Sequence, residues 1–280
     1  MVLSWASAAC ALLAAASTAT GAPSPGGRPP LPQHHGHGED KPPAFFLAGD
    51  STTAVDGGWG NGFLAPLIAP AWGENHGKSG ATTKSFIAEG RWANVTAKLK
   101  ANAKKYDCYV TISFGHNDQK EASNVTFKEY QQNLINFANE VKSLGGKALL
   151  VSSLTRRVFA SEHNVTDSLH DERLAALAAA EATGSTAIDL YAASRAYVAA
   201  LGRDAAYAYN WGGGDEDGAP AGTDRTHLNR RGEVVFGRMV SDLVLRARPA
   251  LGRWVTPNET LSEAIWNNVP ARVGGERGGG

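Results

Sequence analysis

The segment Phe45-Phe-Leu-Ala-Gly-Asp-Ser-Thr-Thr53 joins a short apolar run to a polar turn. The apolar part predicts a buried strand, and Gly49 allows the backbone to turn sharply after it. A second segment, Asp107-Cys-Tyr-Val-Thr-Ile-Ser-Phe114, has the same character and runs into Gly115-His-Asn-Asp118. Polar turns that follow strands are expected at the carboxyl edge of an open sheet, where such folds place their sites.

The central part of the chain alternates strand-like and helix-like patterns, which is typical of βαβ units. Two further strands are expected over residues 147–153 and 186–190, and helices over residues 92–106, 126–144, 170–183, 194–201 and 231–246. The sequence therefore predicts an α/β fold, a three-layer α/β/α sandwich with a mainly parallel sheet. We place this domain at residues 44–248, with a C-terminal extension over 249–273 and a flexible Gly-rich tail over 274–280.

The N-terminal region has the features of a targeting segment and a leader. Residues 1–21 contain an apolar Ala/Leu-rich run followed by small residues, as in a signal peptide. A membrane anchor is the alternative, but the run is shorter than the roughly 20 residues that span a bilayer. Residues 22–43 are rich in Pro, Gly and His and predict a disordered leader. We therefore expect a secreted, extracellular protein.

The sequons and the two cysteines also indicate the compartment in which the protein folds. Four Asn-x-Thr sequons fit passage through a eukaryotic secretory pathway, at Asn94, Asn124, Asn164 and Asn258. Cys10 lies in the signal segment, so Cys108 remains alone and forms no intramolecular disulfide. Because Cys108 lies in an apolar strand, we expect a buried small side chain rather than a reactive thiol.

Composition and spacing argue against several classes of function. The 27 basic and 27 acidic residues give a net charge of zero without a basic stripe, which disfavours nucleic-acid binding. The His34, His35 and His37 tract has no neighbouring carboxylate or cysteine cluster, so a solvated tract is favoured over a metal site. Residues 73–79 resemble a phosphate-binding loop but have three residues between the glycines instead of four, and no strand pattern leads into them. We expect a monomer with no metal, no cofactor, and no membrane or nucleic-acid partner.

Two of the polar blocks supply the groups that nucleophilic catalysis needs. Ser51 is the candidate nucleophile, and a helix that begins near Thr52 would direct its positive end toward an oxyanion. The block Asp224-Arg-Thr-His227 offers a general base and a carboxylate to orient it. The alternatives are that Ser51, or the Asp224 and His227 pair, caps a helix.

Two further blocks supply candidate oxyanion donors. Gly80 would contribute its backbone N–H and Asn117 its side-chain amide, beside the backbone N–H of Ser51. Taken alone, Gly80 and Asn117 are equally typical of ordinary turns. A Gly-x-Ser-x-Gly elbow is absent from the sequence, which argues against the α/β-hydrolase arrangement.

Together the four blocks resemble the SGNH hydrolases, also called GDSL-type, and within them the rhamnogalacturonan acetylesterase-like family. Residues 56–64, a Gly/Trp-rich turn, and residues 85–92, with Glu-Gly-Arg-Trp at their end, are also similar to that family. The resemblance extends from about residue 45 to residue 244. It implies a flavodoxin-like SGNH-hydrolase fold, a catalytic set of Ser51, Asp224 and His227, and an oxyanion hole of Ser51, Gly80 and Asn117.

The resemblance also implies an activity: a metal-independent serine esterase that removes O-acetyl groups from plant cell-wall polysaccharide, above all pectic rhamnogalacturonan. Trp59 and Trp211 are candidate substrate contacts because aromatic faces stack on sugar rings, although they could equally pack in the core. His116 is a further candidate for contacting the sugar, and the alternative is that it supports its loop. Three alternatives stay open. They are an acetylesterase for xylan or another glycan, an esterase for lipids or small esters, and a noncatalytic carbohydrate-binding protein.

Overall fold

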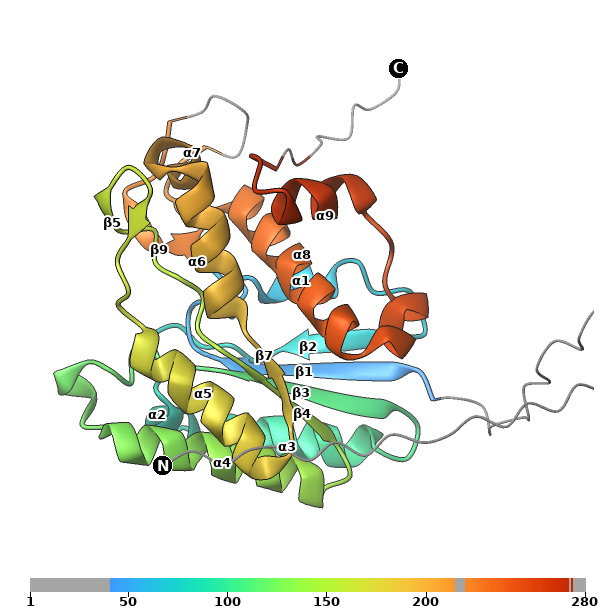
Figure 1. Ribbon diagram of the computed structural model, residues 1–280. Helices are drawn as coiled ribbons and strands as arrows, with labels where there is room; N and C mark the ends of the chain where they lie inside the picture. The colour runs from blue at the N-terminus through green and yellow to red at the C-terminus, as the bar shows by residue number, and fades with distance from the viewer. Residues whose placement is uncertain (1–40, 215–219, 272, 274–280) are drawn as a thin grey trace, which may run out of the picture. The chain divides into compact units, whose positions relative to one another are not determined.

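Five parallel strands form the central sheet, in the order β2-β1-β3-β4-β7 (Figure 1). The computed structural model describes residues 41–214, 220–271 and 273. The strands are β1 (Pro43–Gly49), β2 (Trp72–Asn75), β3 (Asp107–Ser113), β4 (Lys147–Val151) and β7 (Thr186–Ile188). In the centre of the sheet β1 and β3 lie in register, with Ala44 beside Cys108 and Gly49 beside Ser113.

Helices cover both faces of this sheet (Figure 1). One face carries α1 (Gly60–Leu64), α6 (Leu190–Leu201), α8 (Arg230–Ala247) and α9 (Glu259–Trp266), and the other carries α2 (Thr83–Ala88), α3 (Arg91–Asn102), α4 (Phe127–Ser143) and α5 (His170–Thr183). Successive residues of β1 alternate between the two cores: Phe45 and Leu47 enter the first, and Phe46 enters the second. The predicted three-layer α/β/α sandwich is therefore confirmed.

The expected helices are present, with shifts of a few residues at their ends. At α6 the helix begins at Leu190 instead of 194, because the Asp189 carboxylate accepts a hydrogen bond from the Ala192 N–H and caps the helix. The strand β2 was not predicted, because its four residues are only half-buried and show no apolar alternation. The expectation of no strand near residue 73 was therefore wrong, although the glycine spacing there still excludes a phosphate-binding loop.

The expected helix after Ser51 is also wrong. Residues 51–53 form a turn, in which the Thr53 and Ala54 N–H groups both donate to the Asp50 carbonyl at 3.1 Å, and the next helix begins only at Gly60. The interpretation of Ser51 as a helix cap fails for the same reason. No helix terminus therefore supplies an anion site at Ser51.

Two small antiparallel ribbons and the C-terminal segment complete the described fold. The ribbons pair β5 (Phe159–Ser161) with β6 (Asn164–Val165), and β8 (Asn210–Trp211) with β9 (Asp224–Leu228). A short helix, α7 (Arg203–Tyr207), precedes β8, and 3-10 turns lie at Glu121–Ser123 and Pro249–Trp254. The segment that we expected to be an extension beyond residue 248 adds Leu251, Leu261 and Ile265 to the first core.

Some sequence-based expectations fall outside the described residues. These are the signal segment, nearly all of the leader with its histidines, the acidic run 215–217 and the tail over 274–280. Cys108 is described and is a free, buried cysteine, as predicted. Burial, with the nearby charge of Asp107, raises the pKa of its thiol to about 11.

Candidate active site

The turn after β1 places Ser51 at the carboxyl end of the central strands. Gly49 is required there, because a Cβ atom on it would lie 2.3 Å from Thr53 Oγ1 and 2.7 Å from the Ser113 carbonyl oxygen. The buried Asp50 carboxylate accepts hydrogen bonds from the Thr52 N–H at 2.9 Å and the Thr52 hydroxyl at 2.8 Å. These contacts fix the backbone on both sides of Ser51, whose exposed fraction is 5 %.

The β9 strand carries the histidine and its carboxylate. His227 Nδ1–H donates to Asp224 Oδ2 at 2.7 Å, and the N–H groups of Thr226 and His227 both donate to Asp224 Oδ1. Burial alone would raise the pKa of the Asp224 carboxyl, but the hydrogen bonds from the His227 imidazole and from these two backbone groups lower it to about 2. Asp224 is therefore ionised at neutral pH and holds the imidazole with Nδ1 protonated.

This pair faces the serine. Ser51 Oγ lies 2.8 Å from His227 Nε2, and the hydroxyl donates to the unprotonated ring nitrogen. The helix that follows is capped by Asn229, which accepts a hydrogen bond from the Gly232 N–H, and not by Asp224. The interpretation of Asp224 and His227 as a helix cap is therefore wrong.

The candidate oxyanion donors come from two neighbouring turns. Gly80 has φ +78, and a Cβ atom placed on it would have no other atom within 4 Å. Glycine is therefore favoured here by the left-handed backbone conformation and not by lack of space. The segment before it is tied to the nucleophile turn by the Lys78 N–H, which donates to the Gly49 carbonyl at 3.0 Å. In the described part of the chain no hydrogen-bond acceptor takes up the N–H of Ser51 or of Gly80.

Asn117 joins the two turns. One of its amide N–H groups donates to the Ala81 carbonyl at 3.0 Å, while its Oδ1 accepts from Lys120 Nζ at 2.7 Å. These two contacts fix the orientation of the amide plane and leave its second N–H available. Ser51, Gly80 and Asn117 thus lie on segments that the fold brings together.

The two side chains that flank Asn117 have supporting positions. His116 is 2 % exposed, and its Nε2–H donates to the Leu154 carbonyl at 2.8 Å. Burial, with the charge of Arg156, lowers the pKa of His116 to about 3, so the ring stays neutral. Asp118 Oδ1 accepts from the N–H and the hydroxyl of Thr83. Of the two roles that the sequence left open for His116, the substrate contact is therefore corrected, because the buried ring is bonded to Leu154 and supports the loop.

A small cleft opens beside the histidine. It has a volume of about 210 Å³ and is lined by Asp56, Gly57, Ser79, Trp211, Asp224 and His227. Trp211 is 45 % exposed and lies on the rim, where we expected a substrate contact. Trp59 does not lie there: its side chain is 0 % exposed and packs edge-on against Phe63, while its backbone N–H donates to the Thr52 carbonyl. The expected substrate contact by Trp59 is wrong because the ring belongs to the core.

Sequence analysis missed two cationic residues at this site, Lys120 and Arg157. Lys120 contacts the Asn117 amide, and Arg157 contacts the backbone carbonyl of His227. Their sequence signal was weak but real, because both follow strands at the carboxyl edge of the sheet, where site residues collect.

Metal-binding clusters and membrane spans were also sought. Across residues 41–214, 220–271 and 273, histidine, cysteine and acidic side chains nowhere gather in a group of three or more fit for a metal ion. Over the same residues, none of the helices combines the length and apolar character that a membrane crossing requires.

In this site a serine hydroxyl donates to a histidine, the histidine donates to a carboxylate, and backbone N–H groups without an acceptor lie beside the serine. This arrangement defines the serine hydrolases. Residues 47–234 match the GDSL-like Lipase/Acylhydrolase family, and the chain belongs to that family. It is therefore a carboxylic ester hydrolase of the SGNH type. The chain is 30% identical over 212 residues to the rhamnogalacturonan acetylesterase RhgT of Bacillus subtilis (strain 168), a match that spans 72% of this chain and 89% of that protein. The resemblance to rhamnogalacturonan acetylesterase-like proteins is thereby confirmed.

Solved structures of similar fold support the assignment of the architecture. Protein YXIM of Bacillus subtilis superimposes with a TM-score of 0.60 at 22% identity, over 74% of this chain and 57% of that chain. The acetylxylan esterase Axe2 of Geobacillus stearothermophilus gives a TM-score of 0.51 at 22% identity, over 74% of this chain and 94% of that chain. A lipase/acylhydrolase from Enterococcus faecalis gives 0.52 at 19% identity, over 77% and 98%.

Proposed function

We propose that this protein is a secreted serine esterase that removes O-acetyl groups from plant cell-wall polysaccharide, most of all pectic rhamnogalacturonan. The observation that carries the proposal is the 2.8 Å contact between Ser51 Oγ and His227 Nε2, with Asp224 2.7 Å behind the ring. The polysaccharide is inferred from the relative, which is named a rhamnogalacturonan acetylesterase.

The contacts suggest a two-step reaction. Ser51 Oγ attacks the ester carbonyl carbon while His227 Nε2 takes the hydroxyl proton, and the carbonyl oxygen becomes an oxyanion. The N–H groups of Ser51, Gly80 and Asn117 donate to this oxyanion. The imidazolium then gives its proton to the departing sugar oxygen, which leaves an acetyl-enzyme. Water, deprotonated by His227, attacks this ester and releases acetate and the free Ser51 hydroxyl.

The small cleft supports a short acyl group. Its lining of Asp56, Gly57 and Ser79 is polar, and its volume of about 210 Å³ offers no long apolar channel for a fatty chain. Trp211 on the rim has the half-exposed aromatic face that sugar rings stack on. These features favour an acetylated glycan over a lipid ester.

Secretion and glycosylation are part of the proposal, as is a monomeric state. All four sequon asparagines, Asn94, Asn124, Asn164 and Asn258, are exposed, so the fold leaves room for a glycan at each. Expression of the full chain in a secreting eukaryotic host tests this part. The protein recovered from the culture medium should have an N-terminus near residue 22, and its mass should fall on treatment with an N-glycosidase.

The activity is tested by measuring acetate release from acetylated rhamnogalacturonan and acetylated xylan, with Ser51→Ala in parallel. We expect release from rhamnogalacturonan at the higher rate and loss of at least about 10³-fold in the variant. Faster release from xylan would reassign the polymer but keep the esterase. Binding of either polymer without acetate release would favour the noncatalytic carbohydrate-binding alternative.

The lipid-esterase alternative needs its own measurement. A series of p-nitrophenyl esters from acetate to octanoate should give the highest kcat/KM for acetate and a steep fall by butyrate. A maximum at butyrate or longer chains would contradict the proposed acetylesterase.

A further inference from the structure

Arg157 is the largest charged side chain in the buried interior and lies directly behind the catalytic histidine. Its side chain is 0 % exposed. Its Nε–H donates to Asn210 Oδ1 at 2.6 Å, and its Nη2–H donates to the backbone carbonyl of His227 at 2.5 Å. One guanidinium thus bridges both strands of the β8–β9 ribbon, at Asn210 in β8 and His227 in β9.

Burial of this cation is costly, which argues for a specific role. No carboxylate in the described part of the chain lies within ion-pair distance of Arg157, and its Nη1 has no hydrogen-bond partner there. Burial lowers its pKa to about 10, which still leaves the group charged at neutral pH. An apolar side chain would fill the same space without this desolvation penalty. An apolar side chain could not supply the planar, forked set of N–H donors on the guanidinium, so the role of Arg157 lies in the hydrogen bonds that these donors make.

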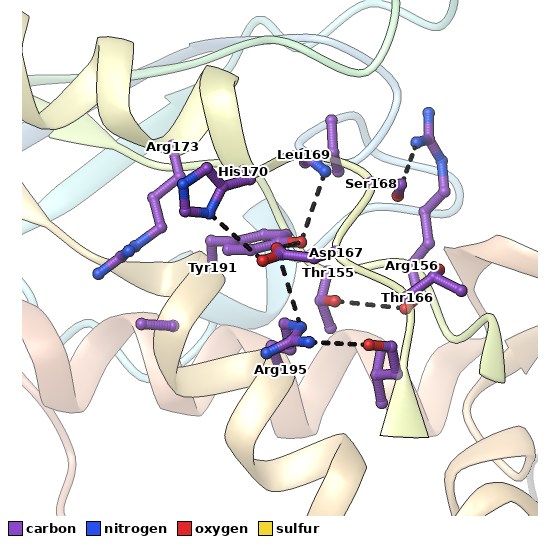
Figure 2. Close-up of polar contacts among 12 residues, drawn as sticks. Thr155, Arg156, Thr166, Asp167, Ser168, Leu169, His170, Arg173, Tyr191 and Arg195 are labelled. Atoms are coloured by element: carbon purple, nitrogen blue, oxygen red, sulfur yellow. Dashed lines mark hydrogen bonds and ion pairs between the residues drawn. The ribbon is translucent and has the colours of Figure 1, made fainter. Parts of the chain in front are cut away.

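The backbone of the segment that carries Arg157 is held by hydrogen bonds to neighbouring elements. Its own N–H donates to the Arg225 carbonyl at 2.8 Å, and the Thr155 N–H donates to the Ser194 hydroxyl of α6 at 3.1 Å. Figure 2 shows the polar network that fixes the segment around it, in which Arg156 reaches Ser168. In the same network the Tyr191 hydroxyl donates to Asp167 at 2.6 Å.

The ribbon itself depends on such contacts because it is separate from the five-stranded sheet. Ser51 is carried by the sheet, whereas Asp224 and His227 are carried by the ribbon, so their mutual distance depends on how the ribbon is docked. Asn210 links Arg157 to the segment that leads into β9, because its Nδ2–H donates to the Gly222 carbonyl in that segment.

We infer that Arg157 is a positioning residue, whose forked hydrogen bonds to Asn210 and to the His227 carbonyl hold His227 Nε2 on Ser51 Oγ. This inference rests on the proposed esterase function. A displacement of about 1 Å in a catalytic group can cost about 10²-fold in rate. Lysine keeps the charge but cannot reach both acceptors at once.

The test uses Arg157→Lys in the full chain, with p-nitrophenyl acetate as the substrate. We expect kcat to fall by about 10- to 100-fold while KM changes by less than about threefold. Arg238→Lys is the matched control: Arg238 is also a buried arginine that donates to a backbone carbonyl, that of Thr256, but it contacts no residue of the site. The control should keep its kcat within about twofold. Assays are run well below each variant's melting temperature, so that loss of folding does not imitate loss of rate.

A second background separates positioning from general loosening. If Arg157 acts through the imidazole, Arg157→Lys should not reduce the residual activity of the His227→Ala variant further. An equal loss in both backgrounds, or an unchanged kcat in the single variant, would overturn the inference. Failure of the wild-type protein to cleave any acetyl ester would instead overturn the proposed function, so the two outcomes are distinct.

Discussion

Trp211 lies directly across the β8–β9 ribbon from Asp224. The register therefore holds an exposed aromatic face beside the carboxylate of the catalytic pair, on the rim of the cleft. A polysaccharide chain that presents an acetyl group to Ser51 would lay a neighbouring sugar on this face.

We predict that Trp211→Ala raises KM for the acetylated polymer about fivefold, which corresponds to about 1 kcal/mol of stacking. The variant should leave kcat/KM for p-nitrophenyl acetate within about twofold, because the small ester makes no contact at the rim. Trp211→Phe, which keeps an aromatic face, is the matched control and should lose less. Equal losses on polymer and small ester would show that Trp211 supports the ribbon instead.

Asp224→Asn should nearly abolish turnover. The amide preserves the shape but presents an N–H group to the ring or forces the other tautomer, as in other Ser-His-Asp hydrolases, where the change costs about 10⁴ in kcat. Steady-state kinetics on p-nitrophenyl acetate measures the loss, and circular dichroism checks the fold. A variant with more than about a tenth of wild-type kcat would mean that His227 needs no partner.

Lys120 should matter through the amide that it contacts. Its Nζ donates to Asn117 Oδ1 at 2.7 Å, so it both orients the amide and polarises the N–H group that is left for the oxyanion. We expect Lys120→Met to lower kcat about tenfold and Asn117→Ala about 10²- to 10³-fold, with little change in KM. Lys128→Met removes an exposed charge on α4 and serves as the control. An Asn117→Ala background in which Lys120→Met still costs tenfold would contradict the coupling.

The contribution of His116 to the stability of the folded protein should be lost in mild acid. Its pKa is lowered by burial to about 3, whereas an unfolded histidine titrates near 6.5. Between these values the imidazole binds one more proton in the unfolded chain than in the folded chain, so the contribution of His116 to stability rises with pH through this window, by up to about 1.4 kcal/mol per pH unit. The buried Asp50 carboxyl, whose pKa burial raises to about 6, contributes with the opposite sign below that pH. Urea unfolding from pH 4.5 to 7 measures the slope.

The matched variant for this titration is His116→Gln, whose amide can still donate to the Leu154 carbonyl. The free energy of unfolding of the variant should depend on pH less steeply than that of the wild type, by about one proton over the window. Identical slopes would show that the ring is not held neutral in the folded state.

Much of the fold was predictable because the buried strands carry a strong local signal. β1 and β3 are continuous apolar runs buried on both faces, and α4, with Leu134 and Phe137 on its inner side, has a clear helical period. The half-buried β2 has no such pattern, and the turn after Ser51 is set by the Asp50 contacts rather than by propensity. The pairing of β2 with β1 is a tertiary contact that no local window contains, whereas the contact of Asp50 with Thr52 is local and was overlooked.

The site was predictable to the extent that its residues lie in ordered polar blocks. Ser51, Gly80, Asn117, Asp224 and His227 could be grouped because each block follows or precedes a recognisable element. Trp59 was placed wrongly because an aromatic residue in a Gly-rich turn has the same local pattern whether it faces solvent or core. Arg157 was missed because a buried cation is unusual, and only the ribbon packed around it reveals its partners.

The division of the site between sheet and ribbon also bears on synthesis. Ser51 and His227 are separated by 176 positions along the chain, so their contact can form only after His227 has been synthesised. A nascent chain that has formed β1, β3 and β4 already carries the serine but has no base to activate it. Esterase activity would therefore be absent from any nascent chain that ends before His227, and the Ser51 hydroxyl would remain unactivated until that residue had been added.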